Sequence, residues 1–180
     1  MKSPKIPDDE ESRLAELRSL EVLDTAAEER FDELTRRAAH YFNVPIALIS
    51  LVDTDRQWFK SAFGLAASQT PREVSFCGHA VAQDSTLVVH DAWSDDRFSD
   101  NPLVMDNPQV RFYAGRPIHG PTGQPLGTFC IIDHVPRELS ERDLSVLNFF
   151  ADQAEAQLGS SAPDESDDAP ADQSAKGTSS

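Results

Sequence analysis

A cysteine and a histidine stand two positions apart in the segment PREVSFCGHAV, residues 71–81, and are the first candidates for chemistry. A Cys/His nucleophile needs the imidazole within hydrogen-bond reach of the sulfur, together with a third group that orients the ring. Side chains at positions i and i+2 of a helix point about 200° apart, so Cys77 and His79 do not face each other if this segment is helical. The spacing argues against a catalytic dyad and leaves open a metal or chromophore anchor or the wall of a pocket.

The other side chains that could bind a metal are scattered along the chain. Structural zinc sites bring Cys and His together in pairs at characteristic short spacings, and this sequence has no such pair. The residues concerned are Cys77, His79, His90, His119, Cys130 and His134. We therefore expect no metal site. Because no export signal is apparent, we also expect the two cysteines to be free thiols.

The composition is that of one acidic domain. The chain has 180 residues, 39% of them hydrophobic, and a formal net charge of -15. This length is enough for one domain with a substantial core. The negative charge repels nucleic acids and anionic membranes, so neither is an expected partner. No segment approaches the roughly 20 apolar residues of a membrane span, and we expect a cytoplasmic location.

The two ends of the sequence differ from its middle. Residues 159–180 contain no aromatic residue, Leu, Ile or Val and are rich in acids, which predicts a disordered acidic tail. Residues 1–9 are expected to form a flexible N-terminus. The folded domain then spans residues 10–158.

Three helices are predicted from capping patterns and apolar stripes. Residues 12–23 form a short helix and residues 25–42 a longer one, which would begin with a capping box between Thr25 and Glu28. The apolar stripe of the second helix consists of Phe31, Leu34, Ala38 and Tyr41. The closing helix, residues 139–158, has Ser140 and Asp143 at the same capping spacing.

Strand patterns fill the region between these helices. Residues 45–53 and 56–64 form a hairpin, and residues 111–118 and 125–133 form another around the turn residues HGPTGQ. Residues 86–92 read as a strand and residues 75–83 as a short helix. The polar connection of residues 94–109 is long for a compact domain, which is typical of segments that are functional or cover something. The pattern predicts an α+β fold.

In this order the segments resemble the GAF domain family, in the form found at the front of bacterial sensor histidine kinases and diguanylate cyclases. The resemblance covers nearly all of residues 13–158. It rests on six blocks and the closing helix: RLAELRSLEVLDTAAEERFDELTRRAA, VPIALISLVDTDRQWFKSAFGL, TPREVSFCGHAV, VVHDAWSDDRFSDNPLV, VRFYAGRPI and GQPLGTFCIIDHVPRELS.

The resemblance implies a GAF/PAS-like fold and a regulatory role. Its central antiparallel sheet would carry the N- and C-terminal helices on one face and a small-molecule pocket, roofed by residues 71–110, on the other. Nothing after Leu158 resembles an output domain, so a signal would pass to a histidine kinase or diguanylate cyclase in trans, or through assembly. The closing helix has a wide apolar face, which either packs wholly on its own sheet or leaves an edge for a homodimer.

Strand alternation and the covering loop suggest which residues line this pocket. Arg111, Tyr113 and Gly115 share one face of their strand, and Gly115 permits close approach. Which face of residues 127–133 points to the pocket is left open by the sequence. The candidate ligand-binding residues are Phe76, Cys77, His79, Trp93, Phe98, Asn101, Arg111, Tyr113, Gly115 and Phe129. Each also has an ordinary structural interpretation in the core, a cap or an ion pair.

Three functions are compatible with these residues. The first is a non-enzymatic sensory module that binds an unidentified small molecule and dimerises through its terminal helices. The second is a ligand-free dimerisation or docking module whose pocket is filled by Phe76, Tyr113 and Phe129. The third is a thiol redox enzyme using Cys77, because Cys77 and Gly78 are similar to an element of free methionine-R-sulfoxide reductases.

The family's known ligands and its enzyme each lack a matching motif here. The reductase resemblance also calls for a reactive cysteine before the later strand, and NPQVRFYAG, residues 107–115, has none. The signature of cyclic-nucleotide-binding members is absent. Bilin-binding members commonly have Cys followed directly by His, whereas Gly78 separates the pair here. The ligand is therefore not identified by the sequence.

Overall fold

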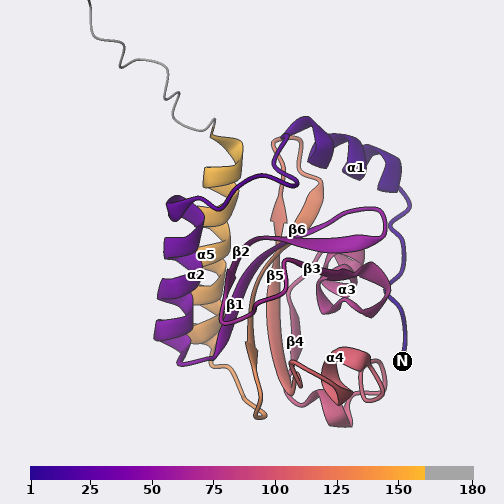
Figure 1. The fold of residues 1–180 in the computed structure, drawn as a ribbon, viewed down its shortest axis with the longest axis vertical. Helices are drawn as coiled ribbons and strands as arrows, with labels where there is room; N and C mark the ends of the chain where they lie inside the picture. Colours follow the sequence, from indigo (N-terminus) through magenta and orange to yellow (C-terminus); the bar gives the residue numbers. More distant parts are fainter. Residues whose placement is uncertain (161–180) are drawn as a thin grey trace, which may run out of the picture.

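A six-stranded antiparallel sheet in the order β3-β2-β1-β6-β5-β4 forms the centre of the molecule (Figure 1). The computed structural model describes residues 1–160. The strands are β1 (Ile46–Val52), β2 (Arg56–Phe63), β3 (Gln69–Pro71), β4 (Leu87–Val89), β5 (Phe112–His119) and β6 (Pro125–Asp133). The two central strands, β1 and β6, pair with Leu48 opposite Cys130 and Ile49 opposite Phe129. Because both faces of these strands are covered, β1 is buried along its whole length.

Two long helices lie side by side on one face of the sheet, which we call the helical face (Figure 1). They are α2 (Glu29–Phe42) and α5 (Glu141–Gly159). A third helix, α1 (Glu10–Ser19), packs at the end of the sheet and adds Leu14 and Leu17 to the same apolar core. The centre of this core is fully buried and consists of Phe31, Ala38, Ile49, Phe112, Ala114, Phe129, Ile131, Leu147 and Ala151.

Short elements cover the opposite face, which we call the cover face (Figure 1). They are the helices α3 (Phe76–Gln83) and α4 (Pro102–Met105) and the 3₁₀ turns η1 (Arg72–Val74) and η2 (Ala92–Ser94). Short helices have few hydrogen bonds of their own and depend on capping. Ser75 caps α3 by accepting from the amide of Gly78, and Asn101 caps α4 by accepting from the amide of Leu103.

The structure confirms the expected α+β class and the main strands and helices. The sequence did not predict β3, a three-residue edge strand paired with β2. Within residues 1–160, no helix combines the length and the apolar character needed to cross a bilayer. The predicted acidic tail lies, from residue 161 onward, outside the described residues.

The N-terminal segment, expected to be flexible, instead lies against the cover. The amide of Lys2 donates to the carbonyl of Arg97, and the carbonyl of Lys2 contacts His79 Nε2 at 2.9 Å. A side chain at Gly78 would collide with Pro4, so the glycine allows this close packing. The structure thus places these residues against α3 and the residues around Arg97, and their flexibility stays a prediction.

One predicted capping box is formed and the other is not. Ser140 and Asp143 exchange both hydrogen bonds at the start of α5, as predicted. In α2, however, the helix begins at Glu29, later than expected, and Glu28 makes no capping bond. The carboxylate of Glu28 is instead paired with Lys60 at 2.7 Å, and the Thr25 hydroxyl donates to the carbonyl of Val22. A buried cation that needs a partner therefore overrides the local capping pattern.

Candidate ligand pocket

A cavity of about 150 Å³ lies between the sheet and its cover. Its floor comes from the cover face of β1, β2, β5 and β6, and its roof from residues 65–77 and 103–110. Most of the lining is apolar, with a few polar groups among it. The lining consists of Leu48, Gln57, Phe59, Leu65, Ala66, Ala67, Thr70, Phe76, Cys77, Leu103, Asn107, Pro108, Val110, Tyr113 and Ile132.

Strand register explains which side chains reach the cavity. Tyr113 of β5 lies opposite Ile132 of β6, and directly opposite residues of an antiparallel pair share a face. Gly115 lies opposite Cys130 in the same way. The cover face of β6 is therefore the one carrying Thr128, Cys130 and Ile132, which settles the choice that the sequence left open.

Four polar side chains form a buried cluster at the cavity wall. Cys77 Sγ accepts hydrogen bonds from Thr128 Oγ1 at 3.0 Å and from Tyr113 Oη at 3.3 Å. The sulfur of Cys130 lies 3.9 Å from that of Cys77, and both thiols are free and buried. Each polar group of the cluster thus finds a partner inside it, as buried polar groups require.

The same contacts shift the acidities of the cluster. Burial disfavours the thiolate of Cys77, but hydrogen bonds from Cys130, Thr128 and Tyr113 outweigh this and lower its pKa. Burial and the adjacent Cys77 sulfur raise the pKa of Cys130. Burial, together with negative charge on the two cysteines, raises the pKa of Tyr113, so its hydroxyl is held as a hydrogen-bond donor. These surroundings thus favour ionisation of Cys77 over ionisation of Cys130 or Tyr113.

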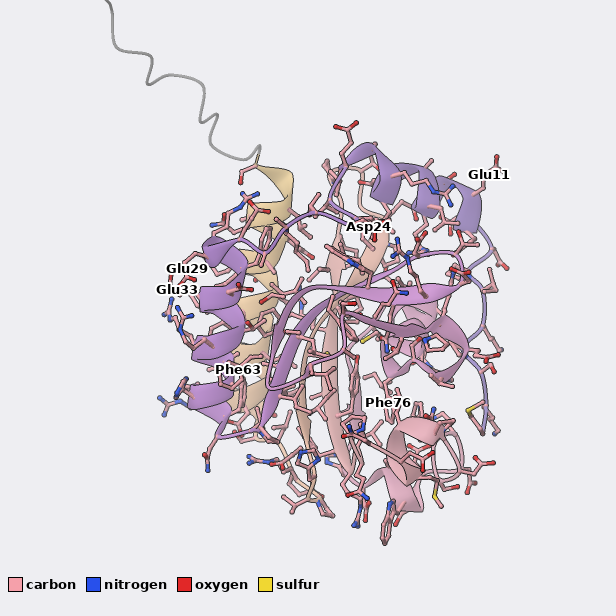
Figure 2. The ribbon with its side chains drawn as sticks, viewed as in Figure 1. Glu11, Asp24, Glu29, Glu33, Phe63 and Phe76 are labelled. Atoms are coloured by element: carbon pink, nitrogen blue, oxygen red, sulfur yellow. The ribbon has the colours of Figure 1, made fainter. Side chains whose placement is uncertain are left out.

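Aromatic rings hold the inner side of the roof. Phe76 lies between the sheet and the cover, away from α2 and α5 (Figure 2). Its ring stacks on Phe98 with centroids 4.0 Å apart and tilts against Tyr113 at 5.1 Å. His79 packs edge-on to Phe98 and contacts the N-terminal segment, so it points away from Cys77. Phe76 lines the cavity, whereas Phe98 and His79 support it from behind.

Three other predicted site residues lie away from the cavity. Asn101 is buried, caps α4 and donates to the carbonyl of Val74, which ties two covering segments together. Arg111 forms a two-bond ion pair with Asp91. Its guanidinium lies 4.0 Å from the ring of Trp93, which is 61% exposed. Asn101 therefore has a structural role, and Arg111 and Trp93 form a surface pair.

The structure corrects the expectation for Phe129 and refines that for Gly115. Phe129 points to the helical face, where its ring stacks on Phe150 with centroids 5.6 Å apart, so it does not line the cavity. Gly115 is on the cover face, but the ring of Tyr113 lies across it. A Cβ at Gly115 would stand 2.1 Å from the Tyr113 hydroxyl oxygen. The glycine makes room for the tyrosine rather than for a ligand.

Sequence reasoning missed several residues that line the cavity. Gln57 comes from β2, Thr70 from β3, and Leu65, Ala66 and Ala67 from the loop between these strands, and none of them was a candidate site residue. Cys130 could have been found from the hairpin: the turn at residues 119–124 sets the register that puts Cys130 opposite Gly115.

A larger groove of about 630 Å³ lies between α2 and the outer strands and is open to solvent. Its main cation, Lys60, is already bonded to Thr25 Oγ1 at 2.8 Å, Ala26 O at 2.7 Å and Glu28 at 2.7 Å. Lys60 therefore has its partners within the protein, and the cavity beneath the cover, which is less open to solvent than the groove, is the better candidate site. Among residues 1–160, no three His, Cys, Asp or Glu side chains are arranged to hold a metal ion.

Comparisons with known proteins agree with this architecture. The sequence profile of the GAF domain family matches residues 26–158. A cyclic di-GMP phosphodiesterase of Pseudomonas aeruginosa is 46% identical over 152 residues, which cover 84% of this chain and 26% of that protein. This chain therefore spans about a quarter of the length of that relative.

Solved structures show the same fold at low sequence identity. The GAF domain of a phosphoenolpyruvate-protein phosphotransferase from Acinetobacter is 16% identical, with a TM-score of 0.59 over 82% of this chain and 92% of that chain. A free methionine-R-sulfoxide reductase from Thermoplasma acidophilum is 13% identical, with a TM-score of 0.60 over 72% of this chain and 90% of that chain. From the profile match and the shared fold, the chain belongs to the GAF domain family, a family of signalling and sensory modules.

Proposed function

We propose that this chain is a non-enzymatic sensory GAF module that binds one small, mostly apolar molecule in the cavity beneath its cover. The observation that carries the proposal is the partly enclosed space of about 150 Å³ between the sheet and residues 65–77 and 103–110. Well-packed interiors leave few voids larger than a water molecule, so a space of this size supports the proposal of a binding site.

The size of the cavity limits the ligand. Pockets for drug-sized molecules have volumes of about 300–1,000 Å³, whereas about 150 Å³ holds a molecule such as benzene. A cyclic dinucleotide or a tetrapyrrole would require the cover to open. We therefore infer a ligand about the size of a single aromatic ring or a short branched chain.

The polar groups of the wall define how that ligand would be oriented. The side-chain amide of Gln57 and the hydroxyl of Thr70 lie at one side, and the hydroxyl of Tyr113 and the sulfur of Cys77 lie in the wall. Gln57 and Thr70 are bonded to each other at 2.5 Å. One or two hydrogen-bonding atoms on an otherwise apolar ligand match this lining.

The cavity is not filled by side chains, which favours ligand binding over a filled, ligand-free module. That alternative required Phe129 to help fill the pocket, and Phe129 lies on the other face of the sheet. Phe76 and Tyr113 pack against each other and still leave the space between them and residues 65–67. Ligand binding would act by favouring one arrangement of the cover, because only differential affinity shifts such an equilibrium.

We further propose that the module acts as a cytoplasmic homodimer that regulates an output enzyme. Phe149 on α5 and Tyr41 on α2 are 49% and 46% exposed, which offers aromatic contact area for a second copy. The relative named as a cyclic di-GMP phosphodiesterase supports an enzyme of cyclic di-GMP signalling as the output, alongside a diguanylate cyclase or histidine kinase acting in trans.

The ligand proposal is tested with phenol and benzene as probes of the expected size. A ligand at 100 times its Kd adds about 2.7 kcal/mol to the free energy of unfolding, which for a domain of this size raises Tm by roughly 5 °C or more. Ala66→Phe adds a ring at an exposed position that lines both the cavity and the open groove, and it should abolish the shift. No shift with any probe of this size in the wild type would refute the proposal.

Ala62→Phe is the matched control for that variant. Ala62 is exposed on β2 and lines the open groove but not the cavity. It should leave the shift intact, so loss in both variants would place the binding outside the cavity. Native mass spectrometry of protein purified from its own host then reports both the retained ligand and the number of copies.

A further inference from the structure

We propose that Cys77 and Cys130 form a redox site in which a hydroperoxide that enters the cavity oxidises Cys77, and Cys130 closes the disulfide. The inference goes beyond ligand sensing and does not require that a ligand binds. It rests on two observations: the two buried thiols lie next to each other, and one of them, Cys77, lines the cavity.

The two sulfurs are close enough for a disulfide to form without refolding. They lie 3.9 Å apart, one on α3 and one on the central strand β6. A disulfide requires about 2.05 Å, so the sulfurs must approach by roughly 2 Å. Rotation about the side-chain bonds of Cys77 and a small shift of α3, a helix of only eight residues, can supply this movement.

Geometry assigns different roles to the two cysteines. Cys77 lines the cavity, whereas Cys130 is not part of the lining and lies behind Cys77, fully buried. An oxidant inside the cavity therefore meets Cys77 first. Cys130 can reach only the sulfur of Cys77, which makes it the resolving thiol.

The surroundings of Cys77 favour its reactive form. The thiolate is the nucleophile in thiol chemistry, and hydrogen bonds to sulfur stabilise it. Thr128 and Tyr113 both donate to this sulfur. The pKa of Cys77 is lowered by these bonds despite burial, whereas that of Cys130 is raised, which agrees with the roles assigned by position.

The reaction balances with a hydroperoxide as the oxidant. The Cys77 thiolate attacks one peroxide oxygen, so an S–O bond forms and the O–O bond breaks, and the departing oxygen takes a proton and leaves as an alcohol or water. The Cys130 thiol then attacks the sulfenic sulfur, forming the S–S bond and releasing water. Two electrons pass from the two sulfurs to the peroxide, and a dithiol reductant restores both thiols by exchange.

Closing this disulfide would change the cavity wall. Cys77 would turn toward Cys130 and away from the hydroxyl of Tyr113, which is fully buried and would lose its main hydrogen bond. An unpaired buried hydroxyl is unfavourable, so the ring or the cover must rearrange. Oxidation is therefore expected to alter ligand affinity as well as thiol content.

The test uses the full chain, reduced and then treated with one equivalent of hydrogen peroxide. Because the sequence contains two cysteines only, every thiol change can be assigned. We expect a monomer whose mass falls by about 2 Da, and no thiol that is alkylated after denaturation. A dithiol reductant should restore both thiols and the original mass.

Two variants separate the roles of the cysteines. Cys130→Ser should stop at a sulfenic acid on Cys77, which a 1,3-dione reagent traps. Cys77→Ser should keep its remaining thiol under the same peroxide treatment. Far-ultraviolet circular dichroism checks the fold of each variant. The mass and thiol count of the wild type test the proposal even if a variant does not fold.

Two results would overturn the proposal. One is wild-type protein that keeps both thiols after peroxide treatment, and the other is a disulfide that joins two chains instead of closing within one. Neither result bears on ligand sensing, because the phenol and benzene shifts are measured on fully reduced protein. Failure of those shifts with normal peroxide reactivity would in turn leave the redox site standing.

Discussion

The two faces of the sheet show how one scaffold can hold a rigid core and an adaptable site. On the helical face, α2 and α5 pack their apolar side chains into a continuous core. On the cover face, short helices and turns pack against the same strands and leave a cavity of about 150 Å³. A long helix presents a continuous apolar stripe to the sheet. Short segments joined by turns present no such stripe and fill the space above the strands less evenly.

The two kinds of packing occur on opposite faces of the same strand. In β1, the neighbours Leu48 and Ile49 point to opposite faces, and their partners on β6 are Cys130 and Phe129. Leu48 lines the cavity, whereas Ile49 is fully buried in the helical core. The strands that form the floor of the cavity on the cover face are thus packed directly against the core on the helical face. The experiments below test this difference.

The largest expected effect is the contrast between Ile49→Ala and Leu48→Ala. Truncating a buried Leu or Ile costs 2–5 kcal/mol, depending on how many contacts are lost. We expect about 4 kcal/mol for Ile49→Ala and about 2 kcal/mol for Leu48→Ala, because one side of Leu48 already faces empty space. Denaturant unfolding measures both. Equal losses would mean that the two faces are equally well packed.

A smaller effect is expected from Gly115→Ala on the cover face. The added methyl would overlap the ring of Tyr113, and such overpacking costs about 1–3 kcal/mol. In a Tyr113→Ala background the overlap is gone, so the same substitution should be neutral or slightly stabilising. A double-mutant cycle measures the coupling. The account of Gly115 as the seat of the tyrosine ring fails if the cost is the same in both backgrounds.

The smallest effect concerns His119, which bridges the two faces. Its Nε2 lies 2.6 Å from Asp84 at the end of α3, and its Nδ1 lies 2.8 Å from Glu155 of α5. Burial lowers the pKa of His119, but the bonds to Glu155 and Asp84 outweigh it and raise the pKa above 6.5. Arg116, 3.7 Å from Glu155, is the neighbouring cation and shares that carboxylate.

The sign of the pH dependence follows from the raised pKa. The imidazolium is favoured in the folded state, so its contribution to stability is complete below pH 6.5 and is lost as the pH rises through the folded-state pKa. We expect less than about 1 kcal/mol, as for partly exposed ion pairs. His119→Gln should remove this part of the pH profile. An unchanged profile would show that the bridge does not couple α3 to α5.

Much of the fold could be predicted because its signals are local. The alternation of β5 placed Tyr113 and Gly115 on one face, and the Ser140 cap marked the start of α5. The start of α2 could not be predicted from its capping pattern, since Glu28 binds Lys60 from a distant strand. A local capping preference is therefore lost where the capping residue pairs with a buried charge.

The site was harder to predict because it depends on register and on distant packing. Phe129 and Cys130 are neighbours in sequence, and only the pairing of β6 with β1 and β5 decides which one faces the cover. The thiol pair arises when α3 folds onto β6, because Cys77 and Cys130 are 53 residues apart in the sequence. Residues 65–67 are not among the candidate residues taken from the sequence, yet they line the cavity.

The most direct test of the central claim is hydrogen exchange followed by mass spectrometry, with and without phenol. We predict that β1, β6, α2 and α5 exchange slowest in both states, because the helical face is continuously packed. We also predict that phenol slows exchange in residues 65–77 and 103–110 and leaves α2 and α5 unchanged. Slowing confined to α2 and the open groove, or none in the cover, would contradict a ligand site between the sheet and its cover.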